Sequence, residues 1–140
     1  MRLKSLLITM KIYRIEISDK KEIRSLIDIS ELLIFFDMVL VVSNTSKFMI
    51  KDLKKFLKEE KLEKLDAYKS EVAKINFAVS RSLLNKAFEM ILDIPIENVV
   101  VLRDKYNKPY IKNKSGVKFN ISHTDGFVVI GFSKKELGID

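Results

Sequence analysis

The longest regular pattern in the chain is an apolar stripe at helical spacing between Glu71 and Leu92. Apolar residues that recur every three or four positions lie on one side of an α-helix. Pro95, which has no backbone N–H to donate, follows the stripe and ends the predicted helix. A helix with such a face must pack against a second layer. The stripe consists of Val72, Ile75, Val79, Leu83, Leu84, Phe88 and Ile91.

Short segments with strand-like patterns predict that second layer. Lys11–Ile17 alternates, with Tyr13, Ile15 and Ile17 on one face, as expected for a half-buried strand. A strand, then helices, then a meander of short strands predicts an α+β domain with a long helix packed on a small antiparallel sheet. The later strands are expected at Val99–Leu102, Pro109–Ile111, Lys118–Ile121 and Phe127–Phe132, with Leu137–Asp140 beginning another.

The region between the first strand and the long helix has weaker patterns. Ser18-Asp19 is a plausible N-cap for a helix in which Ile23, Leu26, Ile27 and Ser30 share one side. A further helix is predicted over Asp52–Leu65. Val39–Val42 is compatible with either a strand or the end of a helix, because short apolar runs do not distinguish the two.

Composition limits the class of protein. The 140 residues, 47% of them hydrophobic, suit one domain with a single core. There is no cysteine, which excludes disulfides and thiolate metal sites and fits a reducing compartment such as the cytoplasm. The most apolar stretch, Leu32–Val42, is interrupted by Asp37 and is shorter than the roughly 20 residues that a membrane span needs. A net charge of +7 favours an anionic partner.

The segment Phe119–Thr124 carries the clearest chemical signal. It combines Asn120, Ser122 and Thr124 with His123 at the end of a predicted strand, before Asp125-Gly126. Backbone N–H groups and short hydroxyl side chains at such a turn can gather around an anion. His123 is the only histidine; it could pair with phosphate when cationic or donate one hydrogen bond when neutral. The alternative is a structural histidine with no ligand.

Four other positions have residue types suited to a phosphorylated ligand or to its metal ion. Lys61 and Lys64 lie three residues apart, hence on one helical face, and could clamp a phosphate dianion or be a solvated pair. Lys108 precedes Pro109, which restricts the local backbone. Asp140 has the oxygen ligands that Mg²⁺ prefers, although one carboxylate does not define a metal site.

Taken in order, three motifs resemble those of the 4′-phosphopantetheinyl transferases of the surfactin-synthetase-activating type. The family patterns are Gly-Lys-Pro, Phe-Asn-hydrophobic-Ser-His-Ser and Gly-hydrophobic-Asp-hydrophobic-Glu. The segments Met10–Tyr13 and Glu60–Lys64 are also similar to the family, so the resemblance covers roughly residues 10–18 and 53–140. The matching motifs here are Lys108-Pro109, Phe119–Thr124 and Gly138-Ile139-Asp140.

The resemblance implies transfer of the 4′-phosphopantetheine group from coenzyme A to a serine of an acyl or peptidyl carrier protein, with Mg²⁺. Such proteins serve fatty acid, polyketide or nonribosomal peptide biosynthesis in the cytoplasm. By this resemblance Asp140 would be a catalytic residue and Mg²⁺ ligand, and Lys61 and Lys64 would hold the 3′-phosphate of coenzyme A. Ser122, Lys108 and the catalytic His123 would contact the nucleotide and its phosphates.

The resemblance also implies an incomplete enzyme. Family members are pseudo-dimers of two similar α+β halves with coenzyme A between them, and residues 1–140 correspond to the N-terminal half as a single domain. One of three expected metal carboxylates lies within this length. A C-terminal half-domain, or self-association, is therefore an expected partner beside the carrier protein; nucleic acid and membrane are not expected.

Several positions depart from the family pattern. Asn107 stands where the family has glycine, and Asn76 and Asn85 stand where it has arginines. Arg81 is a candidate to replace part of the lost positive charge. Residues 19–52 are longer and more apolar than the family's corresponding stretch, and are interpreted as a divergent insertion.

Two other functions remain as alternatives. The chain could be a non-catalytic remnant that binds coenzyme A or another anion, or that serves only in assembly. It could also be a small basic nucleic-acid-binding domain. That second alternative is disfavoured because basic residues are mixed with acidic ones and the aromatic residues fall at core-like spacing.

Overall fold

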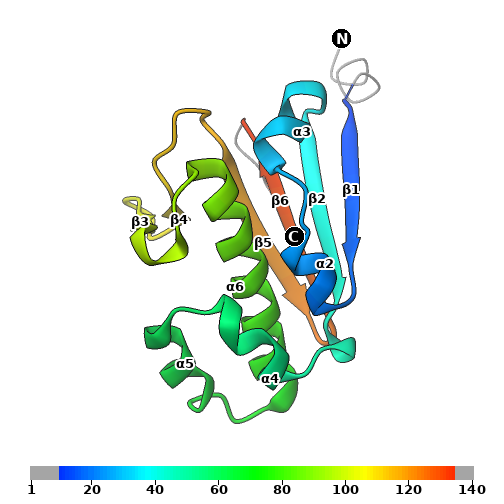
Figure 1. Ribbon diagram of the computed structural model, residues 1–140, viewed down its shortest axis with the longest axis vertical. Helices are drawn as coiled ribbons and strands as arrows, with labels where there is room; N and C mark the ends of the chain where they lie inside the picture. Colours follow the sequence, from blue (N-terminus) through cyan, green and yellow to red (C-terminus); the bar gives the residue numbers. More distant parts are fainter. Residues whose placement is uncertain (1–9, 135–140) are drawn as a thin grey trace.

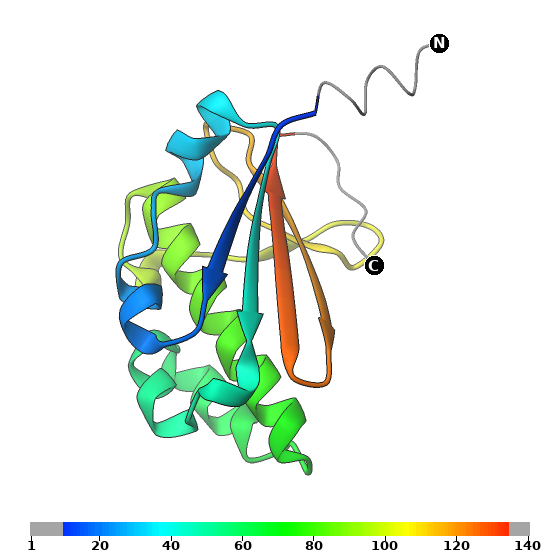
Figure 2. The same cartoon turned by 90° about the vertical axis from the view of Figure 1, so that its right-hand side faces the viewer.

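The computed structural model describes residues 10–134, which form a four-stranded sheet with the helices on one of its faces (Figures 1 and 2). Strand β1 (Ile12–Ile17) pairs parallel to β2 (Met38–Asn44). Strand β6 (Phe127–Ser133) then pairs antiparallel to both β2 and β5 (Lys118–Thr124). The predicted α+β fold is thus confirmed, and the β1–β2 pair is the one parallel pairing in this sheet.

Two short helices connect the parallel strands. Asp19 caps α2 (Lys20–Arg24) by accepting a 2.9 Å hydrogen bond from the backbone N–H of Glu22. Asp28 caps α3 (Ile29–Phe35) in the same way, through the N–H of Ser30. The prediction of one helix through Ser30 was wrong, because Asp28 has an extended backbone and begins a second helix.

The segment Val39–Val42 is a strand, and it lies inside the sheet. Val39, Val41 and Ser43 on β2 point towards the helices and are buried. The Ser43 hydroxyl donates a 2.8 Å hydrogen bond to the carbonyl of Ile17 on β1. Residues 19–52 therefore supply α2, α3 and the inner strand β2. Their status as an insertion relative to the family stays a prediction.

The predicted helix over Asp52–Leu65 is broken into short pieces. After the 3₁₀ turn η1 (Thr45–Lys47), the chain forms α4 (Ile50–Leu53), η2 (Lys54–Phe56) and α5 (Glu59–Leu65). The backbone is extended at Leu57 and Lys58, which ends one helix and starts the next. The break lets Leu53, Leu57 and Leu65 all reach the core although the chain changes direction.

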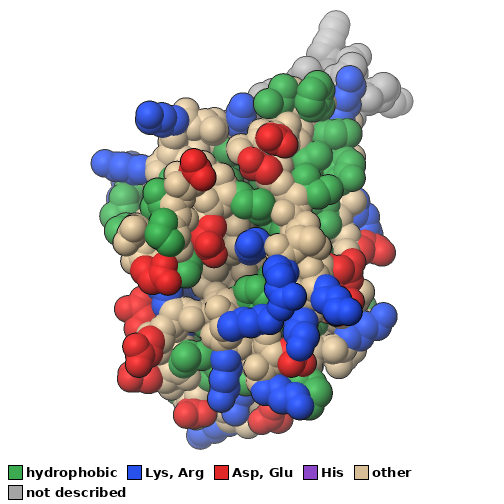
Figure 3. Space-filling model, in the orientation of Figure 1, with side chains coloured by type: hydrophobic (Ala, Val, Ile, Leu, Met, Phe, Trp, Pro, Cys, Tyr) green, Lys and Arg blue, Asp and Glu red, His purple; other side chains and the backbone are tan. Residues whose placement is uncertain are grey.

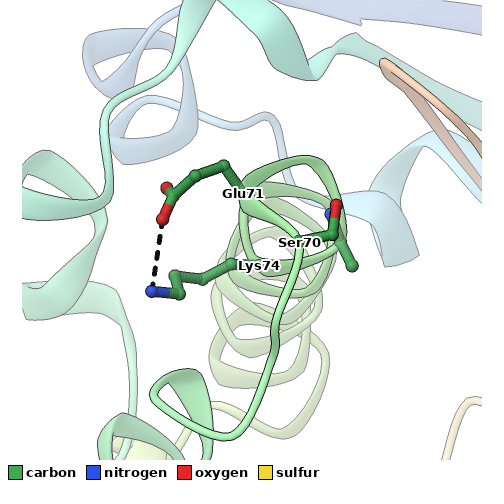
Figure 4. A network of polar contacts seen from close by, with 4 residues as sticks. Ser70, Glu71 and Lys74 are labelled. Carbon is green, nitrogen blue, oxygen red and sulfur yellow. Dashed lines mark hydrogen bonds and ion pairs between the residues drawn. The ribbon is translucent and has the colours of Figure 1, made fainter.

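Helix α6 (Glu71–Leu92) has the bounds that the apolar stripe predicts. At its first turn the Ser70 hydroxyl accepts a hydrogen bond from the N–H of Ala73, and Lys74 pairs with Glu71 at 3.4 Å (Figure 4). At its end Asp93 adopts a left-handed backbone conformation, two residues before Pro95. A side-chain cap such as that of Ser70 at the N-terminus stabilises a helix by about 1 kcal/mol.

The core lies between α6 and the sheet. Phe132, Ile130 and Val128 on β6 are almost fully buried on the helical face. The rings of Phe88 on α6 and Phe119 on β5 lie 5.1 Å apart. Burial of each such side chain contributes roughly 1.5–3 kcal/mol, so this layer dominates the stability of the domain.

The C-terminal third contains a second, smaller sheet beside the main one. After η3 (Ile96–Asn98), strands β3 (Leu102–Arg103) and β4 (Pro109–Tyr110) form a hairpin. The strand predicted at Val99–Leu102 is therefore shorter and begins later. The predicted strand at Leu137–Asp140 lies outside the described residues. Within residues 10–134, no helix is both long and apolar enough to cross a lipid bilayer.

Candidate functional site

The β3–β4 hairpin positions Lys108. The Asp104 carboxylate accepts hydrogen bonds from the backbone N–H groups of Tyr106 and Lys108, at 2.8 and 2.9 Å. The Asp104 N–H donates in turn to the Lys108 carbonyl at 3.0 Å. These bonds fix the turn, and Pro109 fixes the backbone after it. The backbone of Lys108, the lysine of the Lys-Pro motif, is thus held in place by the hairpin.

Asn107 occupies the turn of this hairpin, where the resemblance leads us to expect glycine. Its φ is +66°, in the left-handed region that most side chains avoid. Asparagine tolerates this region better than other residues with a side chain. Its carbonyl accepts a 3.0 Å hydrogen bond from the Arg103 guanidinium. Asparagine at this position is therefore compatible with the turn.

A basic hollow of about 380 Å³ lies on one side of the hairpin. Lys61 on α5, Arg81 on α6 and Arg103 on β3 line it. No carboxylate of residues 10–134 forms an ion pair with any of these three side chains. An excess of cations around a concave surface attracts an anion. The hollow is also lined by Lys58, Glu60, Asn85, Ile96, Val99, Val100 and Val101.

Burial, and after it neighbouring positive charge, lowers the pKa of two cations in this hollow. Burial lowers the pKa of Lys61, and the neighbouring Lys64 and Arg81 lower it further, whereas Glu60 acts in the opposite direction. Burial likewise lowers the pKa of Arg81, helped by Arg103. A bound anion would relieve this repulsion, so the electrostatics of the hollow favour one.

Lys108 faces a second and larger hollow, of about 730 Å³. Its walls combine the hairpin with the loop that leads into β5, and its apolar base includes Ile111, Val117 and Phe119. Arg103 lines the first hollow and Asp104 the second, so the two hollows flank the same hairpin. The rim also carries Lys112, Lys114 and Lys118.

Ser122 and His123 lie near the end of β5. In the strand register His123 is opposite Val128, a residue of the helical face, whereas Ser122 is opposite Val129 on the other face. The imidazole is exposed, and the serine is half-buried. The predicted strand end thus does carry an exposed histidine beside the β5–β6 turn.

Asn76 and Asn85, for which the resemblance leads us to expect arginines, have structural roles. The Asn76 amide donates a 2.8 Å hydrogen bond to the carbonyl of Thr124, and its oxygen accepts a 2.6 Å bond from the Thr45 hydroxyl. The Asn85 amide donates to the carbonyl of Phe56 at 2.8 Å. Both side chains are buried and tie α6 to neighbouring segments.

The predicted site residues fall into two groups. Lys61 and Lys64 adjoin the hollow with Arg81, while Lys108 lies across the hairpin from it. Ser122 and His123 form the other group, at the far end of β5, where their side chains lie on opposite faces of the sheet. His123 is four residues beyond Phe119, which corresponds to about 13 Å along a strand.

Arg103 is the residue that the sequence motifs did not indicate. It lies in the short strand β3, five positions before Lys108, where no periodic pattern marks it. Its proximity to Arg81 depends on how the hairpin packs beside α6, which only the tertiary structure decides. Asp140, the predicted metal ligand, lies outside the described residues; residues 10–134 contain no cluster of three His, Asp or Glu side chains suited to a metal.

A long helix on a small sheet, with basic hollows on both sides of a Lys-Pro hairpin, defines a domain suited to a phosphorylated ligand. Residues 44–135 match the family model described as "4′-phosphopantetheinyl transferase, N-terminal". The match covers more than half of the chain. This chain therefore belongs to the 4′-phosphopantetheinyl transferase superfamily, as an N-terminal half.

A similar protein is the 4′-phosphopantetheinyl transferase gsp of Aneurinibacillus migulanus. The two sequences are 35% identical over 75 residues. That region covers 54% of this chain and 28% of the length of the relative. The chain thus corresponds to a minor part of that protein.

Proposed function

We propose that this chain supplies the N-terminal half of the site of a transferase that moves 4′-phosphopantetheine from coenzyme A to a carrier-protein serine. The observation that carries the proposal is the cation cluster of Lys61, Arg81 and Arg103 beside the Lys108 hairpin, in a chain of this family. Coenzyme A is a nucleotide with a pyrophosphate and a 3′-phosphate, so it carries negative charges that can pair with these cations.

Each group of residues has a separate role in this proposal. Lys61 and Lys64, with Arg81 and Arg103, hold the 3′-phosphate. Lys108 contacts the nucleotide across the hairpin. Ser122 and His123 contact the phosphates at the end of β5, where an imidazolium pairs with a phosphate oxygen and a neutral ring donates one hydrogen bond.

The separation of the two groups suits one extended ligand. The Asn76 amide contacts the carbonyl of Thr124, next to His123, and Arg81 is five residues further along α6. Five residues correspond to about 7.5 Å along a helix axis. The end of β5 that carries the His123 imidazole and the basic hollow therefore lie close enough for one nucleotide with its pyrophosphate to contact both.

The proposed chemistry is phosphoryl transfer. The carrier serine oxygen bonds to the β-phosphorus of coenzyme A, and the serine gives up its proton. The bond from that phosphorus to the oxygen shared with the α-phosphate breaks, and 3′,5′-ADP leaves with the electron pair. The contribution of this chain is to align the pyrophosphate and neutralise charge that develops on its oxygens.

The family resemblance adds Mg²⁺ to this site. A carboxylate oxygen is the donor that Mg²⁺ prefers, so Asp140 fits the role of one ligand. When bound, the ion would neutralise pyrophosphate charge. The remaining carboxylates would come from the C-terminal half.

The open face of the sheet supports the need for that second half. Figure 2 shows the helices on one side of the sheet. On the opposite face, Leu40, Val42 and Val129 are only half-buried, and Phe127 keeps 49% of its surface exposed. An apolar stripe bordered by polar strands β1 and β5 is typical of a protein interface. The proposed occupant is the C-terminal half or a second copy.

Loading of a carrier protein tests the proposed function. The chain, joined to or mixed with a C-terminal half, is incubated with apo-carrier protein, coenzyme A and Mg²⁺, and the mass of the carrier is measured. We expect His123→Ala and Asp140→Ala each to abolish the mass increase. Lys69→Ala, an exposed change outside both hollows, is the control.

The outcomes separate the alternatives. Unchanged loading by the two variants would remove the site assignment. Thermal stabilisation by coenzyme A without loading by any combination of halves would indicate a non-catalytic binding remnant. Binding to DNA or RNA that weakens steeply with salt, with no response to coenzyme A, would indicate a nucleic-acid-binding domain.

A further inference from the structure

Basic side chains gather over α2 and α4 on the helical side of the molecule (Figure 3). We call this surface the α2–α4 basic patch. Lys20 on α2 and Asp52 on α4 form a 3.3 Å ion pair that joins the two helices. The other basic side chains are exposed. The patch consists of Lys20, Lys21, Arg24, Lys51, Lys54 and Lys55.

The carboxylates of this region are already engaged within the domain. Glu22 accepts hydrogen bonds from the backbone N–H and the hydroxyl of Ser18, at 3.0 and 2.8 Å. Asp19 caps α2, and Asp52 pairs with Lys20. Positive charge therefore exceeds negative charge on the patch. Its three carboxylates, Asp19, Glu22 and Asp52, bind groups of the domain itself.

The topology places the patch at one particular end of the sheet. Strands β2 and β5 are both antiparallel to β6, and β1 is parallel to β2. Strands β1, β2 and β5 therefore run in the same direction. Helix α2 follows the end of β1, and η1 and α4 follow the end of β2. The N–H of Thr45 in η1 donates a 2.8 Å hydrogen bond to the carbonyl of Gly126 in the β5–β6 turn. The patch is therefore at the same end of the sheet as His123.

Exposed apolar side chains flank the patch in the chain. Ile27, just after α2, keeps 47% of its surface exposed, and Met49, the N-cap of α4, keeps 56%. Basic charge beside apolar side chains is typical of a protein interface, whereas a phosphate backbone makes no use of the apolar groups. The combination favours an acidic protein surface over nucleic acid.

From these observations we infer that the α2–α4 basic patch is the docking surface for the acidic carrier domain whose serine is modified. The inference rests on the proposed function and adds where the carrier binds. A domain held there lies at the end of the sheet where β5 presents the imidazole. Complementary charge would act mainly by steering and orienting the carrier.

Charge reversal tests this docking surface. The probe is an apo acyl carrier protein of net negative charge with its serine replaced by alanine, and its binding to the 140-residue chain is measured by calorimetry at low salt. The patch variant combines Lys21→Glu, Arg24→Glu and Lys51→Glu. The control combines Lys11→Glu, Lys69→Glu and Lys134→Glu, exposed positions with the same change in net charge.

We expect the patch variant to weaken carrier binding by about tenfold or more, and the control by less than about threefold, because screened distant charges contribute little. A second variant with glutamine at the three patch positions should show an intermediate loss, and melting curves check that each variant folds. Equal loss in patch and control variants would overturn the inference. So would a patch-dependent affinity for a DNA duplex with unchanged carrier binding.

Coenzyme A binding separates this inference from the proposed function. Both charge-reversal variants should bind coenzyme A as the wild type does. If coenzyme A binds and carrier binding does not depend on the patch, the docking surface is wrong and the proposed function stands. If the wild-type chain binds neither coenzyme A nor carrier, both fail.

Discussion

At the scale of single residues, the basic hollow draws its positive charge from residues on three different elements, and two buried asparagines have structural roles. The Asn76 and Asn85 side chains are buried and held by hydrogen bonds. Arg81 and Arg103 reach the hollow from other positions. Arg81 also packs over the ring of Phe77, 5.6 Å from its centre, which orients the guanidinium.

Arg103→Gln tests the role of the arginines in the hollow. We expect it to weaken binding of coenzyme A by about tenfold, the loss of one charge-assisted contact, and to leave 3′-dephospho-coenzyme A less affected. Calorimetry with both ligands measures the difference, with Lys69→Gln as the control. Equal loss for the two ligands would show that Arg103 does not contact the 3′-phosphate.

Asn107 is a second position where one side chain decides a local structure. Its left-handed backbone predicts that Asn107→Gly leaves the free energy of unfolding almost unchanged, while Asn107→Ala lowers it by about 1 kcal/mol. Urea denaturation measures both, and Lys105→Ala in the same hairpin is the control. If the alanine variant were as stable as the glycine variant, the backbone argument would be incorrect.

At the scale of elements, buried polar bonds fix how the helices meet the sheet. Thr45, Asn76 and Thr124 link η1, α6 and the end of β5, with bonds of 2.6 and 2.8 Å. This link holds the strand that carries His123 against the long helix. It also stabilises the sheet end where the basic patch lies.

Asn76→Ala should therefore lower the free energy of unfolding by about 1–3 kcal/mol, because it leaves the buried Thr45 hydroxyl without its acceptor. Chemical denaturation measures the loss. In the double variant with Thr45→Val, part of the loss should be recovered, since no unpaired hydroxyl remains. Simple addition of the two single losses would contradict a shared bond.

The helices also show which sequence patterns were sufficient to predict the bounds of an element. Helix α6 was predicted with correct bounds because its stripe is long and its ends carry Ser70 and Pro95. The segments 20–30 and 52–65 were each predicted as one helix and are broken. A weak amphipathic pattern cannot show that Asp28 caps a new helix, or that Leu57 extends to reach the core.

At the scale of the whole molecule, the sheet has one covered and one open face. The apolar stripe on the open face predicts that the chain self-associates at high concentration when the C-terminal half is absent. Val42→Glu, which places a charge in the stripe, should keep the chain monomeric in sedimentation velocity without unfolding it. Asn98→Glu, exposed and on no strand, is the control. Equal self-association of both variants would contradict an interface on this face.

By itself, the sequence determined the α+β class, the long helix, the resemblance to this family and the candidate residues Lys61, Lys108 and His123. Those inferences depend on local periodicity and contiguous motifs, which need no knowledge of packing. Only the tertiary structure decided that β2 is an inner strand, that Arg103 joins Arg81 and that the basic helices lie beside the end of β5. The physical reason is that such contacts join residues far apart in the chain, and their energies depend on which surfaces the core brings together.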